Sequence, residues 1–340
     1  MNDIKLVGAY ASPYSRKMRA VLRYRRIPFR WIIRGSREDV GIPPVPVALI
    51  PVLAWSDAAG HQAMVDSTFQ IQRLESSYAA RAVKPPDPAL AFLDALIEDY
   101  ADEWLTKVMY HYRWAFTADA AKASHVIPCD QFLDLAPDAL ARASAAFAER
   151  QIDRLRVVGS NETTAPLIEA SYRRLLAALD AHLRSSPFLF GGRPGASDFG
   201  IFGQLSQLTQ FDPTSSTIAA EVAPRVVAWV NRMEDLAWLE VAEHDWASRE
   251  SIRSSLLPFL NEIGRVYAPF LLANTAALAS GADSVECRID EARWVQPPFP
   301  YQAKCLRWLR ERYDGLAAAD RELVDGALAD TGCAALFRPR

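Results

Sequence analysis

The fold of the N-terminal part of the chain is decided by one stretch, Ile4-Lys5-Leu6-Val7-Gly8-Ala9-Tyr10-Ala11-Ser12-Pro13-Tyr14-Ser15. Residues 4–10 alternate enough to predict a β-strand. The next residues place Met18, Val21 and Leu22 on one helical stripe. Ser12 is therefore expected on the turn where a strand leads into a helix. Free backbone N–H groups and the positive end of the helix dipole favour an anionic group at such a turn.

A second informative segment is the apolar run at residues 47–55, which contains Pro51. Proline removes a donor from a sheet ladder, so its presence predicts an edge position or a cis turn. A hairpin turn at residues 57–60 is expected to join this strand to another. Asp66 and Ser67 then open a helical pattern, and a helix start of this kind can receive a carboxylate.

In this order, the strand, the Ser-Pro-aromatic turn, the basic helix, the x-Pro-Val-Leu strand and the acidic-Ser helix opening resemble the N-terminal thioredoxin-like domain of the glutathione transferases. The resemblance implies that Ser12 donates a hydrogen bond to the sulfur of glutathione. It implies that the backbone of Ile50, ahead of a cis Pro51, pairs with the cysteinyl part of the peptide. It also implies that Asp66 and Ser67 hold the γ-glutamyl end.

The rest of the chain is expected to be helical after an interdomain linker at residues 84–88. The predicted fold class is an α+β thioredoxin-like N-terminal domain followed by an all-α glutathione-transferase C-terminal domain with an extra helical extension. We expect the three parts to cover residues 1–82, 90–249 and 250–340. The resemblance covers about residues 4–245 and leaves the extension without a counterpart.

Within the helical part, apolar residues from Leu93 to Tyr112 recur at three- and four-residue steps and predict one long amphipathic helix. Asp198 is expected to cap a core helix, as in the second domain of the transferases. The family usually has Ser or Thr where Gly195 stands, and Gly at an N-cap costs only a few tenths of a kcal/mol. In the extension, residues 302–313 and 320–328 predict two further helices.

Composition and charge restrict the class of protein. The chain has 340 residues, half of them hydrophobic, and a net charge of −3, which argues against a nucleic-acid-binding protein. No apolar run approaches the roughly 20 residues of a membrane span, and no signal-peptide pattern precedes the first strand. The cysteines form no C-x-x-C pair, so neither zinc nor a disulfide framework is expected. We therefore expect a cytoplasmic protein without a metal.

Serine in place of cysteine at residue 12 restricts the chemistry. A cysteine there would permit mixed disulfides, whereas Ser12 cannot form one. The remaining reactions are conjugation of glutathione, a co-substrate here, to a small hydrophobic electrophile, or glutathione-assisted isomerisation or cleavage. The alternative is that Ser12 only caps the helix. Tyr10 and Ser15 are the other candidates for the thiolate contact.

The candidates for the electrophile pocket are Tyr14, Tyr110, Arg113 and Trp114, because the long helix is expected to line the cleft. An aromatic stripe at helical spacing is also typical of a core, so that alternative stays open. The carboxylates at positions 98, 99, 102 and 103 are expected to form a solvated acidic face.

Two other functions remain open from the sequence. One is a non-catalytic transferase fold that serves as a binding or assembly module. The other is a specialised catabolic enzyme, such as a glutathione-dependent ether-cleaving or dehalogenating enzyme, instead of a general detoxification enzyme. Members of the family usually form homodimers, so a homodimer is expected, although the extension could cover or remodel the dimer face.

Overall fold

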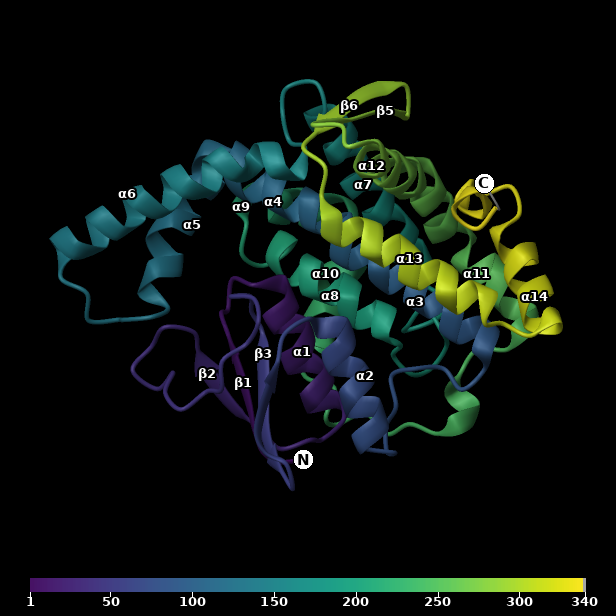
Figure 1. Ribbon diagram of the computed structural model, residues 1–340, viewed down its shortest axis with the longest axis horizontal. Coiled ribbons are helices and arrows are strands. Elements are labelled where there is room, and N and C mark those ends of the chain that lie inside the picture. Colours follow the sequence, from purple (N-terminus) through teal and green to yellow (C-terminus); the bar gives the residue numbers. More distant parts are fainter. Residues whose placement is uncertain (339–340) are drawn as a thin grey trace.

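The computed structural model describes residues 1–338 and begins with a four-stranded sheet and two helices (Figure 1). The strands are β1 (Asn2–Gly8), β2 (Arg30–Ile33), β3 (Val52–Asp57) and β4 (Gly60–Met64), in the order β2-β1-β3-β4. β1 pairs with β2 in parallel and with β3 antiparallel, and β3 and β4 form the predicted hairpin. The helices are α1 (Pro13–Tyr24) and α2 (Ser67–Ser77). The expected thioredoxin-like architecture is therefore confirmed.

The middle of the chain is helical. Its elements are α3 (Pro88–Glu103), α4 (Leu105–Ala115), α5 (Thr117–Cys129), α6 (Pro137–Asp153), η1 (Arg154–Val158), α7 (Ala165–His182), α8 (Ala196–Leu208), α9 (Pro213–Val222), α10 (Pro224–Met233) and η2 (Glu243–Asp245). The single helix predicted from Leu93 to Tyr112 is wrong in one respect, because the helix is interrupted at Trp104. There the N–H of Lys107 donates to the Trp104 carbonyl at 2.9 Å, a tighter turn than an α-helix makes.

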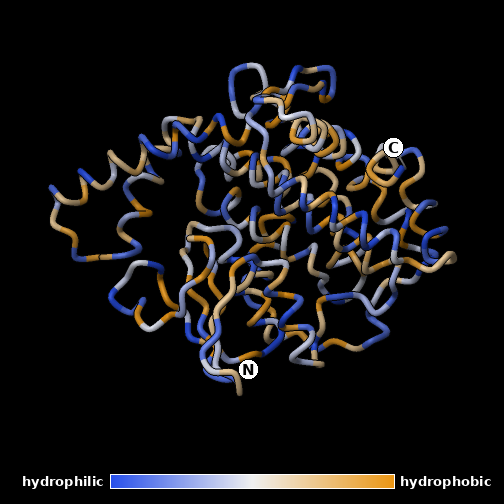
Figure 2. Tube along the Cα trace, in the orientation of Figure 1, coloured by the Kyte–Doolittle hydropathy of each residue, from blue (hydrophilic) through white to orange (hydrophobic). Residues whose placement is uncertain are grey.

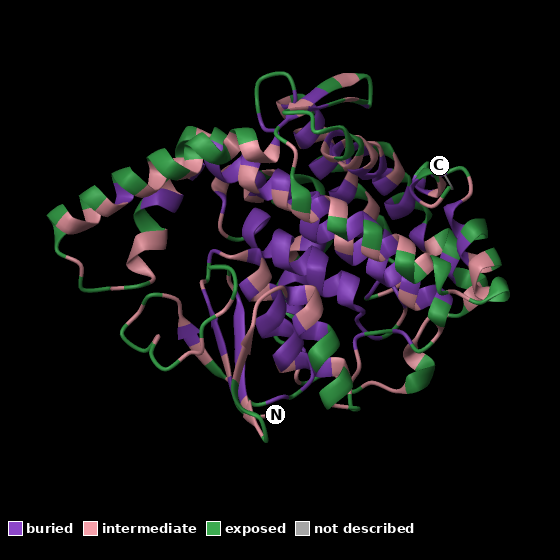
Figure 3. Cartoon of the chain, viewed as in Figure 1, coloured by how far each residue is buried: buried purple, intermediate pink, exposed green. Residues whose placement is uncertain are grey.

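Helix α8 is the centre of the molecule, and every one of its residues is buried between α1 and α3 (Figure 3). Asp198 caps it as expected, since its Oδ2 accepts from the Gly195 N–H at 2.9 Å. A side chain at Gly195 would begin 2.5 Å from Oδ1 of Asp94, which explains the missing Ser or Thr. Asp94 Oδ1 instead accepts from the Ser197 N–H at 2.9 Å, so α3 supplies the second half of the cap.

The C-terminal extension packs beside α3. It contains α11 (Arg249–Glu262), η3 (Ile263–Tyr267), α12 (Ala268–Ser280), β5 (Val285–Ile289), β6 (Ala292–Gln296), α13 (Pro300–Asp314), α14 (Ala318–Leu328) and η4 (Cys333–Leu336). The β5–β6 hairpin corrects the expectation of a purely helical extension. Its turn residues, Asp290 and Glu291, have φ of 50° and 68°. Such turns favour Asn-Gly or Asp-Gly, so Asp290-Glu291 is only a weak turn signal.

Helices α5 and α6 form an arm that projects from the body, with hydrophilic and hydrophobic residues alternating along it (Figure 2). Its tip reaches the loop after β2, where Arg37 pairs with Asp134 at 2.7 Å and Gln131 donates to the Arg34 carbonyl at 3.1 Å. Among residues 1–338, no helix is both long and apolar enough to cross a membrane.

Candidate functional site

The strand register brings the three predicted ligand-binding segments to one edge of the sheet. Val7 lies opposite Val52, and Leu53 lies opposite Met64. The carboxyl end of β1, the start of β3 and the carboxyl end of β4 therefore meet there. Ser12 follows the first of these ends, the Ile50–Pro51 pair precedes the second, and Asp66 follows the third.

Ser12 is half-buried and is the N-cap of α1. Its Oγ accepts from the N–H of Ser15 at 3.2 Å, and its own N–H donates to the Ala9 carbonyl at 3.2 Å. A hydroxyl has one donor and two acceptor positions, so Ser12 can cap the helix and still donate to an anion. Of the alternatives, Ser15 is fully buried and accepts from the Ala9 N–H. Tyr10 is 43% exposed.

The helical domain fixes the turn that carries Ser12. Arg113 donates from Nη1 to the Ala11 carbonyl at 2.7 Å, and Gln207 donates to the Tyr10 carbonyl at 3.2 Å. The same guanidinium binds both carboxylate oxygens of Asp212, at 2.8 and 3.0 Å. Arg113 is 4% exposed, so it supports the turn from the interior instead of facing a cleft.

The second segment has a cis peptide bond between Ile50 and Pro51. Ile50 is half-buried and Pro51 is buried. The fully buried amide of Gln70 in α2 donates to the carbonyls of Pro51 and Met64, at 2.8 and 2.9 Å. One side chain therefore ties the loop before β3 to the end of β4.

Asp66 has a strained backbone, with φ of 77°, and is the N-cap of α2. Its Oδ1 accepts from the Thr68 N–H at 3.1 Å. Its Oδ2 accepts a hydrogen bond from the hydroxyl of Tyr301, which α13 brings from the extension. Burial, followed by this contact with Asp66, raises the pKa of Tyr301, so its phenol stays protonated and remains the donor. The extension thus occupies the carboxylate that was predicted to hold the γ-glutamyl end.

Ser67 belongs to a buried polar cluster. It is 5% exposed, and its Oγ accepts from Nζ of Lys17 at 3.2 Å. The same ammonium binds Asp102 at 2.6 Å and Glu98 at 2.8 Å. Burial opposes the charge of Lys17, but the two carboxylates outweigh it and raise its pKa. The sequence analysis missed Lys17, because nothing in α1 indicates that the carboxylates of α3 pack against it.

The expected solvated acidic face is wrong. Glu98, Asp102 and Glu103 are 5%, 7% and 8% exposed. Lys17 of α1 pairs with Glu98 and Asp102, and Gln302 of α13 lies against Glu103. Burial, followed by repulsion from neighbouring carboxylates, raises the pKa of Asp99 to about 7 and that of Glu103 to about 8. For Asp102, burial outweighs the attraction of Lys17 and raises the pKa to about 6.

The four residues predicted for the electrophile pocket are not gathered at one surface. Tyr14 donates to the Asp102 carbonyl at 2.7 Å, toward α3. Tyr110 is half-buried and binds Gln151 of the arm, and Trp114 is buried against Phe147 of the same arm. Arg113 is engaged by Asp212 in the interior. Of the four predicted residues, Tyr110 and Trp114 are the two that lie near each other, at the base of the arm, with ring centroids 6.3 Å apart.

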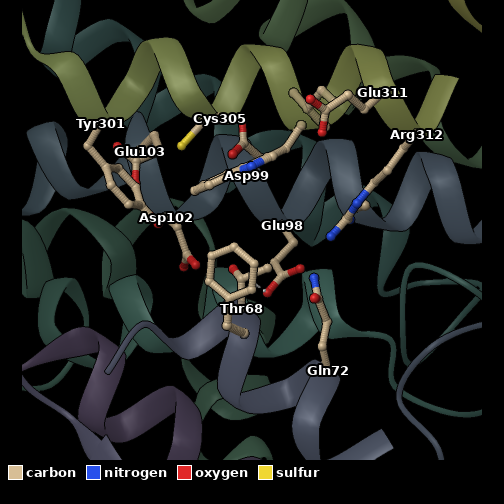
Figure 4. Close-up of a pocket in the computed structure, with 14 residues that line it drawn as sticks. Thr68, Gln72, Glu98, Asp99, Asp102, Glu103, Tyr301, Cys305, Glu311 and Arg312 are labelled. Carbon is tan, nitrogen blue, oxygen red and sulfur yellow. Dashed lines mark hydrogen bonds between the residues drawn. The ribbon is translucent and has the colours of Figure 1, made fainter. Parts of the chain in front are cut away.

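A cavity of about 320 Å³ lies between α2, α3 and α13 (Figure 4). Its lining residues are Thr68, Phe69, Gln72, Ala95, Glu98, Asp99, Asp102, Glu103, Tyr301, Cys305, Trp308, Leu309, Glu311 and Arg312. The ring of Tyr301 lines one end while its hydroxyl binds Asp66. Within residues 1–338, no group of three His, Cys, Asp or Glu side chains is arranged to hold a metal ion.

Comparison with protein families gives two matches. The model described as glutathione S-transferase, N-terminal domain, matches residues 6–82. The model described as glutathione S-transferase, C-terminal domain, matches residues 133–232. Together they cover just over half of the chain. No curated protein sequence matches it.

Several solved structures are similar to part of the chain. Beta-etherase LigF from Sphingobium sp. strain SYK-6 is 17% identical over 75% of this chain and 98% of its own, with a TM-score of 0.45. A glutathione S-transferase from Methylobacterium radiotolerans, solved in complex with glutathione sulfonate, is 21% identical over 68% of this chain and 91% of its own, with a TM-score of 0.40. FzlA from C. crescentus is 17% identical over 75% of this chain and 92% of its own, with a TM-score of 0.41.

The family matches fall on the two parts that the fold distinguishes. The first covers the sheet with the turn of Ser12 and the helix start at Asp66, and the second includes the central helix α8. The predicted resemblance is thereby confirmed, and the chain belongs to the glutathione S-transferase superfamily.

Proposed function

We propose that the protein is a glutathione-dependent transferase in which Ser12 stabilises the thiolate of glutathione. The observation that carries this proposal is the meeting of the Ser12 turn, the Ile50–Pro51 pair and the Asp66–Ser67 helix start at one sheet edge. Ser12 donates to the sulfur, Ile50 and Pro51 hold the cysteinyl backbone, and Asp66 and Ser67 receive the γ-glutamyl group.

In this reaction the thiol of glutathione loses its proton to water, helped by the hydroxyl of Ser12 and the N-terminus of α1. The thiolate attacks a carbon of a small hydrophobic electrophile, a C–S bond forms, and the leaving group departs with its electron pair. Tyr110 and Trp114 at the base of the arm are the side chains that we assign to the electrophile. Tyr14 and Arg113 do not contact the substrate in this proposal; they support α1 and the turn before it.

Glutathione binding tests this proposal. In titration calorimetry we expect wild-type protein to bind glutathione and Asp66→Ala to bind it at least tenfold more weakly, because a carboxylate that pairs with the γ-glutamyl ammonium is lost. Asp57→Ala is the matched control. Like Asp66, Asp57 accepts a hydrogen bond from a backbone N–H two residues later, but it lies at the end of the β3–β4 hairpin that is far from the proposed site. We expect Ser12→Ala to raise the pKa of the bound thiol, measured by thiolate absorbance, with a smaller effect on affinity. No binding at millimolar glutathione would overturn the proposal.

One observation favours a second candidate, a binding module that holds no glutathione. Tyr301 already fills one oxygen of Asp66, and Lys17 already binds Ser67. In a transferase, the γ-glutamyl ammonium would compete with the Tyr301 hydroxyl for this oxygen of Asp66. In a binding module, the contact is permanent.

We expect Tyr301→Phe to raise the affinity for glutathione about tenfold. A hydrogen bond to a charged group contributes about 1.5–3 kcal/mol, and removing this competitor of the ammonium frees roughly the 1.4 kcal/mol that a tenfold change requires. Tyr313→Phe on the same helix is the control, because its hydroxyl donates to Asp325 at 2.7 Å on the exposed surface. Weaker binding by Tyr301→Phe would show instead that the phenol contributes to the peptide site.

A further inference from the structure

The cavity between α2, α3 and α13 is not used by the proposed reaction. Ser12 and the Ile50–Pro51 pair do not line it, and Tyr301 separates it from Asp66. Its deep end is formed by Asp102, Glu103 and Cys305, all buried. Its mouth is formed by exposed side chains, including Glu311 and Arg312. It therefore leads from solvent to a buried acidic end.

The lining of this cavity has an excess of carboxylates. Five of its residues are acidic and one, Arg312, is basic. Lys17 lies behind Glu98 and Asp102 and neutralises part of this charge. Carboxylates gathered in a desolvated space repel one another unless they take up protons or further cations enter. The electrostatics of the lining therefore favour a ligand with positive charge.

A buried oxygen at the deep end lacks a partner. Asp102 is 7% exposed, and its Oδ2 binds Lys17, but its Oδ1 has no hydrogen-bond partner among residues 1–338. Leaving a buried carboxylate oxygen unpaired is costly. In Figure 4 the side chains of Glu98 and Asp102 extend from α3 into the space that Thr68 and Tyr301 border. An ammonium that reached this oxygen would satisfy it.

The opposite wall is aromatic. The rings of Phe69 and Trp308 meet edge to face with centroids 5.0 Å apart, and Tyr301 lies 5.9 Å from Trp308. Aromatic faces attract organic cations and also pack against methylene groups. Because the described carboxylates are not grouped as metal ligands, an organic ammonium suits the cavity better than a metal ion.

Four of the five acidic residues lie on two successive turns of α3, with Glu98 and Asp99 on one and Asp102 and Glu103 on the next. One helical turn rises about 5.4 Å. Two ammonium groups joined by a short methylene linker could therefore each face one of these two pairs of carboxylates. We propose that this cavity is a binding site for a linear aliphatic polyamine, with one ammonium on Asp102 and its methylene groups on Phe69 and Trp308.

Calorimetric titration of the full chain with spermidine, without glutathione, tests this proposal. At about pH 8 and 0.15 M salt, where surface attraction is screened, we expect one spermidine to bind per chain. Asp102→Asn is expected to weaken binding at least tenfold. Glu322→Gln is the matched control, because Glu322 is exposed on α14 and lies outside the lining. Its affinity should stay within twofold of wild type.

A second pair of variants keeps the proposal testable if Asp102→Asn does not fold. We expect Trp308→Leu to weaken spermidine binding several-fold, whereas Trp238→Leu, which removes a 64% exposed tryptophan elsewhere, should leave it unchanged. Absence of saturable binding, or equal losses in both members of either pair, would overturn the proposal. So would complete loss in Asp66→Ala, because the cation would then sit on Asp66 and not in the cavity.

Discussion

Arg113→Met is expected to lower the free energy of unfolding by about 3–5 kcal/mol at neutral pH, the usual cost of removing one partner of a buried ion pair. Asp212 is fully buried, and Arg113 binds both of its oxygens. Burial raises the pKa of Asp212, and Arg113 is the main group that lowers it. Without Arg113 the carboxyl therefore takes up a proton more readily, so the loss should be smaller at about pH 5 than at about pH 8.

Urea denaturation at these two pH values measures the effect. Arg156→Met is the matched control, because its ion pair with Asp153 is exposed on both sides and such pairs contribute at most about 1 kcal/mol. The double variant Arg113→Met/Asp212→Leu should recover most of the loss, since it removes the uncompensated charge. A loss under 1 kcal/mol in Arg113→Met, or no recovery in the double variant, would contradict this account.

The segments around Ser12 and Asp66 could be predicted because their chemistry is local. A serine before a proline at a strand end, and an aspartate before an apolar helical run, cap helices wherever the chain goes afterwards. The structure places both at N-caps, with Ser12 on α1 and Asp66 on α2. The same reasoning located the cap at Asp198. The second part of that cap, the hydrogen bond from the Ser197 N–H to Asp94, joins residues 103 positions apart and was not predicted.

The surroundings of these caps could not be predicted, because distant segments provide them. Tyr301 binds Asp66 across 235 residues of sequence. A helix with carboxylates at two successive turns is ordinarily a solvated face, and nothing within Pro88–Glu103 tells that α13 will cover it. Periodicity reveals that a helix has two faces, but which helix packs on each face depends on the tertiary fold.

Burial of this acidic face makes stability depend on pH, and Glu103 shows the effect most strongly. Burial, followed by repulsion from Asp99, raises its pKa from 4.5 to about 8. The folded chain then holds a proton that the unfolded chain releases, so the contribution of Glu103 is complete below about pH 4.5 and is lost as the pH rises to about 8. The loss follows a slope of about 1.4 kcal/mol per pH unit.

Glu103→Gln removes this titration while keeping the shape of the side chain. At about pH 4, where Glu103 is mostly neutral in both the folded and the unfolded chain, we expect the variant and wild type to unfold at nearly the same urea concentration. At about pH 8.5 the variant should be more stable, by roughly 2–4 kcal/mol, after allowing for relaxation that reduces the full shift. The groups with the largest effect on Glu103 are Asp99 and Asp102 on α3, Gln302 on α13 and Lys107 on α4. Tyr14, Tyr267, Tyr301 and Cys305 also interact with it.

These neighbours remain in the variant, so wild type and variant share most of their other pH dependence. Lys107 acts with the opposite sign, because burial lowers its pKa to about 7 and its contribution to stability grows as the pH rises. Glu322→Gln on the exposed face of α14 serves as the control and should show no such pH dependence. An advantage of Glu103→Gln that is equal at both pH values would mean that Glu103 is ionised throughout. The acidic face would then have to be hydrated or paired with a cation, as spermidine binding at Asp102 would provide.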